Sequence, residues 1–515
     1  MVQGTGSDVG KSILVCALCR IFRQEGLKVA PFKAQNMSNN SYVTVGGEEM
    51  GRAQVAQAEA AGLRPAVEMN PILLKPTGNN GSQIITMGKP LGHMTANEYY
   101  ENKNKMLDVA KEAYSALSEQ YDIIVIEGAG SPAEINIKDN DIVNMKIAEI
   151  ADAPVILVTD IDRGGSFAWI VGTLELLSSD ERERVCGIII NKFRGDMGIL
   201  EPGIEMLEER IGKPVLGVLP YFNDINIDNE DSLCLDSGNR ELDNKNYKPS
   251  ESQIDIVVIR LPRISNFTDF DILKGERDVS VRFVNDEQFI GKPDLIIIPG
   301  SKNTIGDLTF IKENGIADTI TNLAKNGTMV IGICGGYQML GKEIRDSGNA
   351  ESKIAQIGGL GLIDVRTIFM QQKNTYQIKA KLYGSSQDTR PNLNNFNTKS
   401  ELTGYEIHMG ETERLNGTLP FLKIIERADK EVCVDDGAIS DDGNVIGTYV
   451  HGIFDNDEFR LELINCVRKK KDLSPIQPED LSTVDKEKQY DKLADLFKKH
   501  INMDLIYGMI EGLKN

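Results

Sequence analysis

Short runs of consecutive apolar residues, separated by amphipathic segments, constrain this fold more than any other feature. In the first half of the chain the runs span residues 27–33, 121–128, 153–160, 185–191 and 214–220. A second series spans residues 254–262, 293–300, 327–334 and 444–452. Strands that are apolar on successive residues are covered on both faces, as in parallel sheets flanked by helices. The pattern therefore predicts an α/β protein with two doubly wound parallel sheets.

A polar stretch divides the two series. Residues 225–253 are rich in Asn, Asp and Ser and lack periodicity, which is typical of a domain end followed by a linker. We expect domains at residues 1–235 and 254–460, a linker at 236–253 and a C-terminal helical segment at 461–515. In that segment Tyr490, Leu493 and Phe497 recur at helical spacing, which predicts a helix docked on the body of the protein.

The composition excludes several classes of function. The 515 residues include 57 Lys and Arg against 77 Asp and Glu, and the net charge of −20 argues against a general binder of nucleic acid or anionic membranes. No apolar run approaches the ~20 residues that span a bilayer, and the N-terminus lacks a signal-peptide pattern. Cys16 and Cys19 lie in an apolar helical run, which favours a buried helix face over a metal or redox site. We therefore expect a cytoplasmic protein.

A glycine-rich loop opens the chain. GTGSDVGKS, residues 4–12, departs from the usual G-x-x-x-x-G-K-[ST] pattern, because Thr5 stands where the first glycine is expected. The N–H groups of such a loop, and of the helix after it, bind phosphate oxygens. We predict a nucleotide site whose contacts are Gly4, Thr5, Gly6, Ser7, Asp8, Val9, Gly10, Lys11 and Ser12. The alternative is a glycine turn that merely precedes a helix.

Individual residues of this site have distinct predicted roles. Lys11 would reach the outer phosphates, and the Ser12 hydroxyl would ligate Mg²⁺. Glu127 ends the run at 121–128, where an acid often faces the metal, although it could instead cap a turn. Only three residues precede the loop, so the strand that holds it is expected to be short.

The shifted loop resembles that of the dethiobiotin synthetase-like amide-forming and carboxylating ligases. The resemblance implies that Asn191, which follows the run at 185–191, reads the adenine base. A hydrogen bond within its own loop is the alternative role for Asn191.

A cysteine in the second half has the setting of a nucleophile. Cys334 lies in GICGGYQML, a strand-to-helix turn of the nucleophile-elbow type, where helix N–H dipoles stabilise a thiolate and an oxyanion. Gly335 would supply one N–H of the oxyanion hole, and the loop with Gly300 and Ser301 resembles its other half. His451, in GTYVHGIF, is the predicted base. A small buried core residue is the alternative for Cys334, but its flanking glycines suit an ordinary core helix poorly.

Residues 254–460 resemble a class I glutamine amidotransferase domain. Many such domains have Glu two residues after the histidine, whereas this chain has Ile453. The resemblance therefore implies either a Cys–His pair or a third member from elsewhere in the chain. Glu406 and His408, in GYEIHMG, are expected either to line the site or to support the fold.

Five motifs carry a narrower resemblance. They are KAQNMSNNS (33–41), EMGRAQVAQAEAAG (49–62), NPILLKPTG (70–78), EGAGSPAEIN (127–136) and TDIDRGGSFA (159–168). Together they resemble the cobyric acid synthase family along essentially the whole chain. The resemblance implies ATP and Mg²⁺ as cofactors and L-glutamine and the corrinoid adenosylcobyrinic acid a,c-diamide as substrates. It further implies that the b, d, e and g carboxylates become amides through acyl phosphates and ammonia released from glutamine.

Two alternatives belong to different classes. One is the a,c-diamide synthase or another ligase that amidates a polycarboxylate. The sister enzyme places acidic residues where this chain has QNMSNN, at 35–40, which favours the first assignment. The other alternative is a deviant P-loop ATPase switch whose C-terminal module is not catalytic. For the corrinoid we expect a surface built from residues 33–41, 70–78 and 127–136.

Overall fold

The structure is a computed structural model that describes residues 1–78, 81–222, 224–227, 253–383, 400–482 and 485–512. The predicted linker at 236–253 lies outside these residues except for residue 253. The domain limits given above therefore stay a prediction. Among the described residues, no helix combines the length and apolar character required to cross a membrane.

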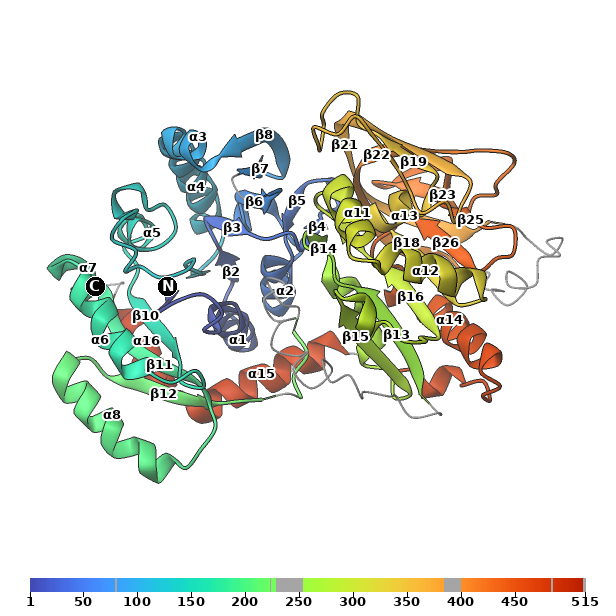
Figure 1. The fold of residues 1–515 in the computed structure, drawn as a ribbon. Helices are drawn as coiled ribbons and strands as arrows, with labels where there is room; N and C mark the ends of the chain where they lie inside the picture. Colours follow the sequence, from blue (N-terminus) through green and yellow to red (C-terminus); the bar gives the residue numbers. More distant parts are fainter. Residues whose placement is uncertain (79–80, 223, 228–252, 384–399, 483–484, 513–515) are drawn as a thin grey trace.

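The first sheet places the glycine-rich loop at the end of a central strand (Figure 1). The strand β1 (Val2–Gly4) pairs with β10 (Val155–Asp160), which continues to β11 (Val185–Phe193) and β12 (Val215–Pro220). On its other side Val2 bridges to Glu127, directly after β9 (Ile123–Ile126), which pairs with β2 (Val29–Phe32). All of these pairings are parallel.

Helices cover both faces of this sheet, which confirms the doubly wound α/β prediction. Val158 and Ile189 pack against α1 (Lys11–Gln24) on one face. Leu157 and Ile188 pack on the other face with α6 (Ser166–Leu176) and α8 (Met197–Ile211). Successive residues of one strand thus enter different cores, which is the reason that these strands are apolar throughout.

The strand before the loop is as short as expected, but it is firmly held. Each residue of β1 pairs with a residue of β10, and the N-terminal amine donates a hydrogen bond of 2.8 Å to the carbonyl oxygen of Pro154. The loop therefore starts from a fixed point in the middle of the sheet.

A smaller layer of strands stands between the first sheet and the second half of the chain (Figure 1). It comprises β3 (Gln35–Met37), β6 (Ile72–Pro76), β7 (Gly81–Thr86) and β8 (Lys89–Thr95), together with the hairpin of β4 (Ser41–Val43) and β5 (Glu49–Gly51). The apolar-run pattern did not predict this layer. It is followed by α3 (Ala96–Glu101) and α4 (Lys103–Ser118).

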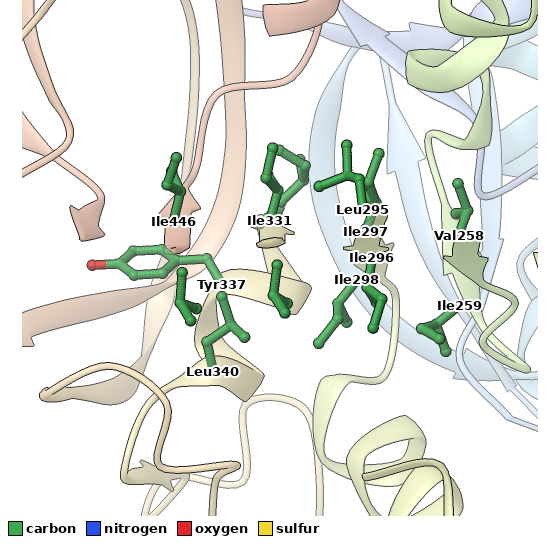
Figure 2. Close-up of a cluster of buried hydrophobic side chains, with 14 of the residues drawn as sticks. Val258, Ile259, Leu295, Ile296, Ile297, Ile298, Ile331, Tyr337, Leu340 and Ile446 are labelled. Carbon is green, nitrogen blue, oxygen red and sulfur yellow. The ribbon is translucent and has the colours of Figure 1, made fainter. Parts of the chain in front are cut away.

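The second sheet confirms the second predicted series. Its order is β15 (Val279–Val284), β13 (Ile254–Ile259), β16 (Leu295–Ile298), β18 (Met329–Ile333), β26 (Val445–Thr448) and β25 (Ala438–Ile439). All of its pairings are parallel except the last. Figure 2 shows the isoleucines of β16 beside Ile331, with Ile446 on the other side of Ile331 and Tyr337 of α13 (Gly335–Leu340) next to Ile446.

A further sheet covers the second half of the chain. It is built around the long strands β21 (Val365–Leu382) and β22 (Leu402–Arg414), which pair antiparallel. Its other strands are β20 (Gln356–Gly358), β19 (Glu343–Arg345), β23 (Leu422–Arg427) and β24 (Lys430–Asp436).

The C-terminal helices divide between the two halves of the molecule. The helix α14 (Asp457–Lys470) packs on the second sheet, whereas α15 (Lys486–His500) and α16 (Met503–Glu511) return to the first. Tyr490, Leu493 and Phe497 of α15 are buried against the α1 side of the first sheet, as their spacing predicted. Arg20 of α1 adds ion pairs of 2.7 Å to Glu487 and to Asp491 of α15.

Candidate functional site

Cys334 lies at a sharp turn between β18 and α13. Its backbone has φ 52° and ψ −106°, a conformation that costs energy for a residue with a side chain and that is found where strain serves a site. The next glycines make room for this turn. A Cβ atom on Gly336 would lie 1.9 Å from the carbonyl oxygen of Ile298, so the helix crosses the neighbouring strand too closely for any other residue.

His451 follows β26 and lies beside Cys334. The ring is 1% exposed, and its Nδ1 atom lies 2.6 Å from the Oδ2 atom of Asp269. Burial opposes protonation of the ring, but the Asp269 carboxylate and the neighbouring Cys334 outweigh it and raise the pKa of His451 to about 10. The structure thus brings together the predicted nucleophile and the predicted base.

Asp269 is a site residue that sequence reasoning missed. It lies in the short helix η3 (Phe267–Phe270), 182 residues before His451 in the sequence. No spacing rule connects positions so far apart. The only signal in the sequence is a polar and acidic run, SNFTDFD, shortly after the first strand of the second series. Ile453, at the position of the usual glutamate, is buried in the core.

The predicted oxyanion-hole residues meet at the same place. Gly300 and Ser301 form β17 (Gly300–Ser301), which pairs with β14 (Ile264–Ser265). A Cβ atom on Gly300 would lie 3.2 Å from Cε1 of His451, and one on Gly335 would lie 2.8 Å from the backbone nitrogen of Ser301. The backbone at Gly300 therefore lies against the His451 ring, and the backbone of Ser301 lies against Gly335, the residue after Cys334.

Glu406 and His408 support the strand β22 beside the site. Glu406 accepts two hydrogen bonds from Arg427, of 2.8 and 3.0 Å. Although burial raises its pKa, His408 and Arg427 outweigh that effect and hold the pKa of Glu406 below its usual value. His408 stacks on Tyr449 at 3.8 Å and contacts the carbonyl oxygen of Gly410. These contacts stabilise β22. This strand lies next to Cys334, since the Cys334 thiol is 3.5 Å from the carbonyl oxygen of Ile407.

The glycine-rich loop has a steric reason for its shifted glycine. A Cβ atom on Gly4 would lie 2.6 Å from a methyl carbon of Val9, so the loop folds back over this position. Lys11 Nζ donates hydrogen bonds of 2.8 Å to the carbonyl oxygen of Gly6 and 3.2 Å to that of Gly130. The amine is thus held across the mouth of the loop, where a phosphate would replace the carbonyl oxygens as its partner.

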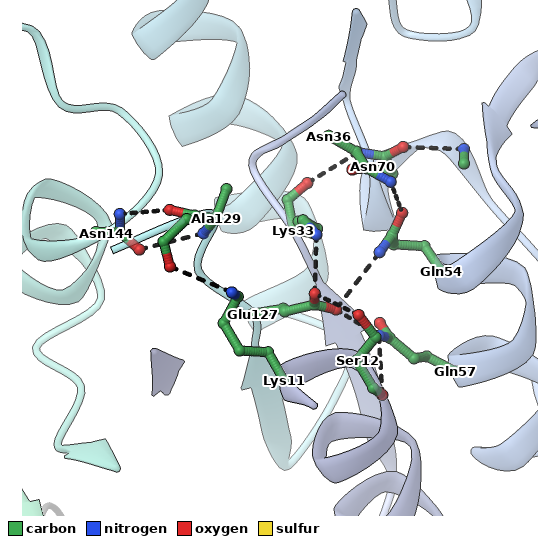
Figure 3. A network of polar contacts seen from close by, with 12 residues as sticks. Lys11, Ser12, Lys33, Asn36, Gln54, Gln57, Asn70, Glu127, Ala129 and Asn144 are labelled. Atoms are coloured by element: carbon green, nitrogen blue, oxygen red, sulfur yellow. Dashed lines mark hydrogen bonds and ion pairs between the residues drawn. The ribbon is translucent and has the colours of Figure 1, made fainter. Parts of the chain in front are cut away.

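Glu127 is the centre of a buried polar network (Figure 3). Its Oε1 atom accepts hydrogen bonds of 2.8 Å from the Ser12 hydroxyl and from Lys33 Nζ. Its Oε2 atom accepts from Gln57 at 2.5 Å and from Gln54 at 3.5 Å. Glu127 is fully buried, and Lys33 neutralises its charge. The sequence placed Lys33 in a motif without assigning it a role.

Ser12 and Glu127 offer oxygen ligands of the kind that Mg²⁺ prefers. Within the described ranges no group of three or more His, Cys, Asp or Glu could hold a metal ion, so phosphate oxygens and water would complete the coordination. Lys33 and a cation would compete for the same carboxylate, because both are attracted to Glu127.

Asn191 is engaged with the loop itself. Its side-chain amide donates a hydrogen bond of 2.9 Å to the carbonyl oxygen of Val9 and accepts one of 2.8 Å from the backbone nitrogen of Lys192. The amide also packs against Gly10, where a Cβ atom would lie only 2.1 Å from it. The contact between Asn191 and adenine stays a prediction.

A cavity of about 1620 Å³ opens beside the loop. Ser7 and Gly130 form part of its wall next to the nucleotide loop, and Gln35 and Met37 lie on its β3 side. Its lining includes four basic and six acidic residues, and two of the lysines are paired with two of the acids. The basic residues are Lys103, Lys138, Lys146 and Arg184, and the acidic ones are Glu134, Asp139, Asp141, Glu149, Asp180 and Glu181. Each of the three surfaces expected for the corrinoid contributes residues to its lining.

Two family models match the chain. The model described as a CobQ/CobB/MinD/ParA nucleotide binding domain matches residues 1–233, which include the glycine-rich loop and Glu127. The model described as a CobB/CobQ-like glutamine amidotransferase domain matches residues 255–459, which include Asp269, Cys334 and His451.

Several curated relatives match along their full length. A protein named cobyric acid synthase from Listeria monocytogenes serotype 4b (strain CLIP80459) is 50% identical over 516 residues, which cover 100% of this chain and 97% of the relative. A protein of the same name from Thermoanaerobacter sp. (strain X514) is 51% identical over 516 residues, with 100% and 99% covered. A third, from Clostridium botulinum (strain Loch Maree / Type A3), is 51% identical over 514 residues, again with 100% and 99% covered.

Proposed function

The chain belongs to the cobyric acid synthase family, and from this premise we propose that it amidates the b, d, e and g carboxylates of adenosylcobyrinic acid a,c-diamide. Glutamine supplies the nitrogen, and ATP activates each carboxylate. One observation carries this proposal: a buried Cys334–His451–Asp269 constellation and a phosphate-binding loop beside a large cavity occur in one chain.

In the glutaminase reaction Cys334 attacks the side-chain carboxamide carbon of glutamine. The N–H groups of the Gly300–Ser301 strand and of Gly335 stabilise the oxyanion. His451 carries the proton that the leaving ammonia requires, and Asp269 orients its ring. Water then hydrolyses the thioester to glutamate and restores the thiol.

In the ligase reaction a substrate carboxylate attacks the γ-phosphorus of ATP, which releases ADP and leaves an acyl phosphate. Ammonia attacks the acyl carbon, and phosphate leaves as the amide forms. Lys11 and the loop N–H groups bind the phosphates, while Ser12 and Glu127 would hold Mg²⁺, which supplies charge neutralisation. The protein therefore contributes mainly position and electrostatics to this step.

The cavity beside Ser7 and Gly130 is the proposed acceptor site. It is large enough for a macrocyclic substrate, and it lies next to the loop that would present the γ-phosphate. Lys103, one of the basic side chains of the lining, would pair with a peripheral carboxylate of the substrate. Because ATP and glutamine are both abundant in the cytoplasm, we place the reaction there.

Mass spectrometry of the corrinoid after incubation with enzyme, ATP, Mg²⁺ and glutamine tests this function. We expect four successive products, each lighter by the difference between a hydroxyl and an amino group. Cys334→Ala should abolish the reaction with glutamine and retain it with ammonium salts, because the ligase site is intact. An unchanged corrinoid with either nitrogen source would refute the proposal.

A further inference from the structure

The two-stranded ribbon of β14 and β17 connects the predicted oxyanion hole with the acid that holds His451. The strand β17 ends beside Gly335, because a Cβ atom on that glycine would lie 2.8 Å from the backbone nitrogen of Ser301. The strand β14 leads through Asn266, in the left-handed conformation with φ 51°, into η3, which carries Asp269. The position of this ribbon therefore decides where two parts of the glutaminase site lie.

The hydrogen bonds of the ribbon show which N–H group of β17 is directed away from its partner strand. The backbone N–H of Lys302 donates a hydrogen bond of 2.9 Å to the carbonyl oxygen of Arg263. The next pair along the ribbon, which contains Ser301, is therefore of the non-hydrogen-bonded kind, because the two kinds alternate in an antiparallel ladder. It follows that the N–H of Ser301 points away from β14, whereas the N–H of Gly300 points toward it.

A buried acid, Asp307, holds both strands of this ribbon. It lies in the first turn of the helix α11 (Thr304–Glu313), which begins shortly after β17, and it is 2% exposed. Its Oδ2 atom accepts a hydrogen bond of 2.7 Å from the Ser301 hydroxyl and one of 3.1 Å from the backbone N–H of Arg263. One oxygen atom thus ties the strand that contains Ser301 to the residue that precedes β14.

The carboxyl group of Asp307 is an acceptor in both contacts. Burial raises the pKa of Asp307 to about 6, although the hydrogen bonds from Ser301 and Arg263 and the positive charge of Arg263 lower it. The group is therefore mainly ionised at neutral pH, and hydrogen bonds to an ionised acceptor are the stronger kind. The Ser301 hydroxyl also accepts a hydrogen bond of 3.0 Å from the backbone N–H of Asn303, so this side chain serves the loop itself.

We propose that Asp307 is a positioning residue for the oxyanion hole. It fixes Ser301 so that the backbone N–H of Ser301, and not that of Gly300, donates to the oxyanion formed from glutamine. Its contact with Arg263 also fixes the start of β14, and with it the segment that leads to Asp269. This inference rests on the proposed function.

The chemistry of the glutaminase reaction states when this donor is needed. As the Cys334 sulfur bonds the carboxamide carbon, the π pair of the carbonyl group moves onto oxygen, and the same happens when water attacks the thioester. The N–H of Ser301 meets a full negative charge only in these two steps. A displaced donor therefore lowers kcat and leaves KM for glutamine nearly unchanged.

Three substitutions test the contact between Asp307 and the ribbon. Asp307→Ala removes the acceptor, whereas Asp307→Asn keeps an oxygen atom that can accept the same two hydrogen bonds. Ser301→Ala removes the hydroxyl and keeps the backbone N–H. Thr309→Val is the matched control, because Thr309 lies in the same helix and its hydroxyl donates to the carbonyl oxygen of Ile305. All are assayed as full-length protein for glutamate release in the presence of ATP, Mg²⁺ and corrinoid.

We expect Asp307→Ala to lower the kcat for glutamine by about 10²-fold, because small displacements of a catalytic group have effects of this size, and to leave KM within about twofold. Ser301→Ala should lower kcat by about tenfold, since one hydrogen bond to the carboxylate is lost. Asp307→Asn should retain more activity than Asp307→Ala, and Thr309→Val should equal the unchanged protein. In the double variant Ser301→Ala/Asp307→Ala the two losses should not multiply, because both remove the same contact.

Alkylation of Cys334 by iodoacetamide provides a readout that a general disturbance of the site would change. The sulfur displaces iodide from a saturated carbon, so the reaction forms no oxyanion and does not need the Ser301 N–H. We expect the alkylation rate, followed on the Cys334 peptide by mass spectrometry, to stay within about twofold in every variant, because the oxyanion hole acts only on charge that develops on oxygen. Amidation of the corrinoid with ammonium salts should also persist.

An undiminished kcat in Asp307→Ala and Ser301→Ala would overturn the inference. Equal losses of glutamine hydrolysis and of alkylation would overturn it as well, because the cysteine itself would then be disturbed. If Asp307→Ala does not fold, Ser301→Ala decides the question by the same two rates. These results leave the proposed function standing, provided that the unchanged protein forms the corrinoid amides. If the unchanged protein neither releases glutamate nor amidates the corrinoid, the proposed function itself fails.

Discussion

The imidazole of His451 lies between the Asp269 carboxylate and the Cys334 thiol, almost completely shielded from solvent. With a pKa of about 10 the ring is protonated at neutral pH, and it places a positive charge beside Cys334. Because this pKa lies above the ordinary value of about 6.5, the interaction stabilises the fold fully below that pH. Its contribution is lost as the pH rises toward 10. The buried carboxylate of Asp269 thus keeps a proton on the ring next to the nucleophile.

Asp269→Asn should lower the kcat for glutamine hydrolysis by roughly 10²- to 10⁴-fold, because the ring loses both its orientation and its counter-charge. The alkaline limb of the pH–rate profile should also move to lower pH, since the pKa of His451 falls when the carboxylate is removed. A pH series of initial rates measures both effects. The same change at Asp318, an exposed residue of the helix α12 (Ile316–Lys325), should alter neither. An unshifted alkaline limb would contradict the assigned role.

The two glycines of the loop should respond differently to a single methyl group. Gly4→Ala should destabilise the protein by about 1–3 kcal/mol, because the added carbon would lie 2.6 Å from Val9. Gly6→Ala has nothing within 4 Å of its added carbon and should change stability by less than about 0.5 kcal/mol. Denaturant unfolding of the ligand-free proteins compares them. Equal losses would show that the shifted glycine has no steric cause.

At the scale of elements, prediction from sequence succeeded where a run of consecutive apolar residues decided the structure. Every strand expected from an apolar run exists, because a run that is apolar on both faces is shielded from water only inside a sheet covered on both sides. The long strands β21 and β22 were not predicted. Residues of β21 alternate in burial only near its two ends, its middle is exposed or half-buried, and the partner of each residue lies far away in the sequence. Asp269 was missed for the same reason, since its position depends on the fold as a whole.

The helix α15 offers a direct test of packing between distant elements. Phe497→Ala should cost about 3–5 kcal/mol of unfolding free energy, because the side chain is 1% exposed in the core shared with α1. Lys499→Ala, on the exposed side of the same helix, should cost less than about 0.5 kcal/mol. Denaturant titration of both variants gives the comparison. A small loss at Phe497 would mean that α15 is not an integral part of the first core.

At the scale of the whole molecule, the two halves meet through charge as well as shape. Glu49 and its partner Lys75 come from the first half of the chain, and its other partner, Lys373, comes from the second half. A buried carboxylate between two ammonium groups is stable only while all three are present. The overall charge of −20 gave no indication of this buried ion-pair cluster, since a net charge does not show which charged residues pair with one another.

Glu49→Gln should cost about 3–5 kcal/mol, because two buried lysines would then face each other without a counter-charge. The double variant with Lys373→Met should cost less than the sum of the two single changes. Unfolding of the four proteins completes this double-mutant cycle. If the losses of unfolding free energy are additive, Glu49 and Lys373 do not interact across the contact between the two halves.

The return of α15 to α1 also sets an order of events during synthesis. A ribosome makes α1 long before α15, so the apolar face of α1 lacks its cover while the second half is being made. The second half can close its own core first, although it is translated later. The nascent first half therefore remains incomplete for a time, with apolar surface exposed to solvent. At this stage the chain would either bind chaperones or aggregate.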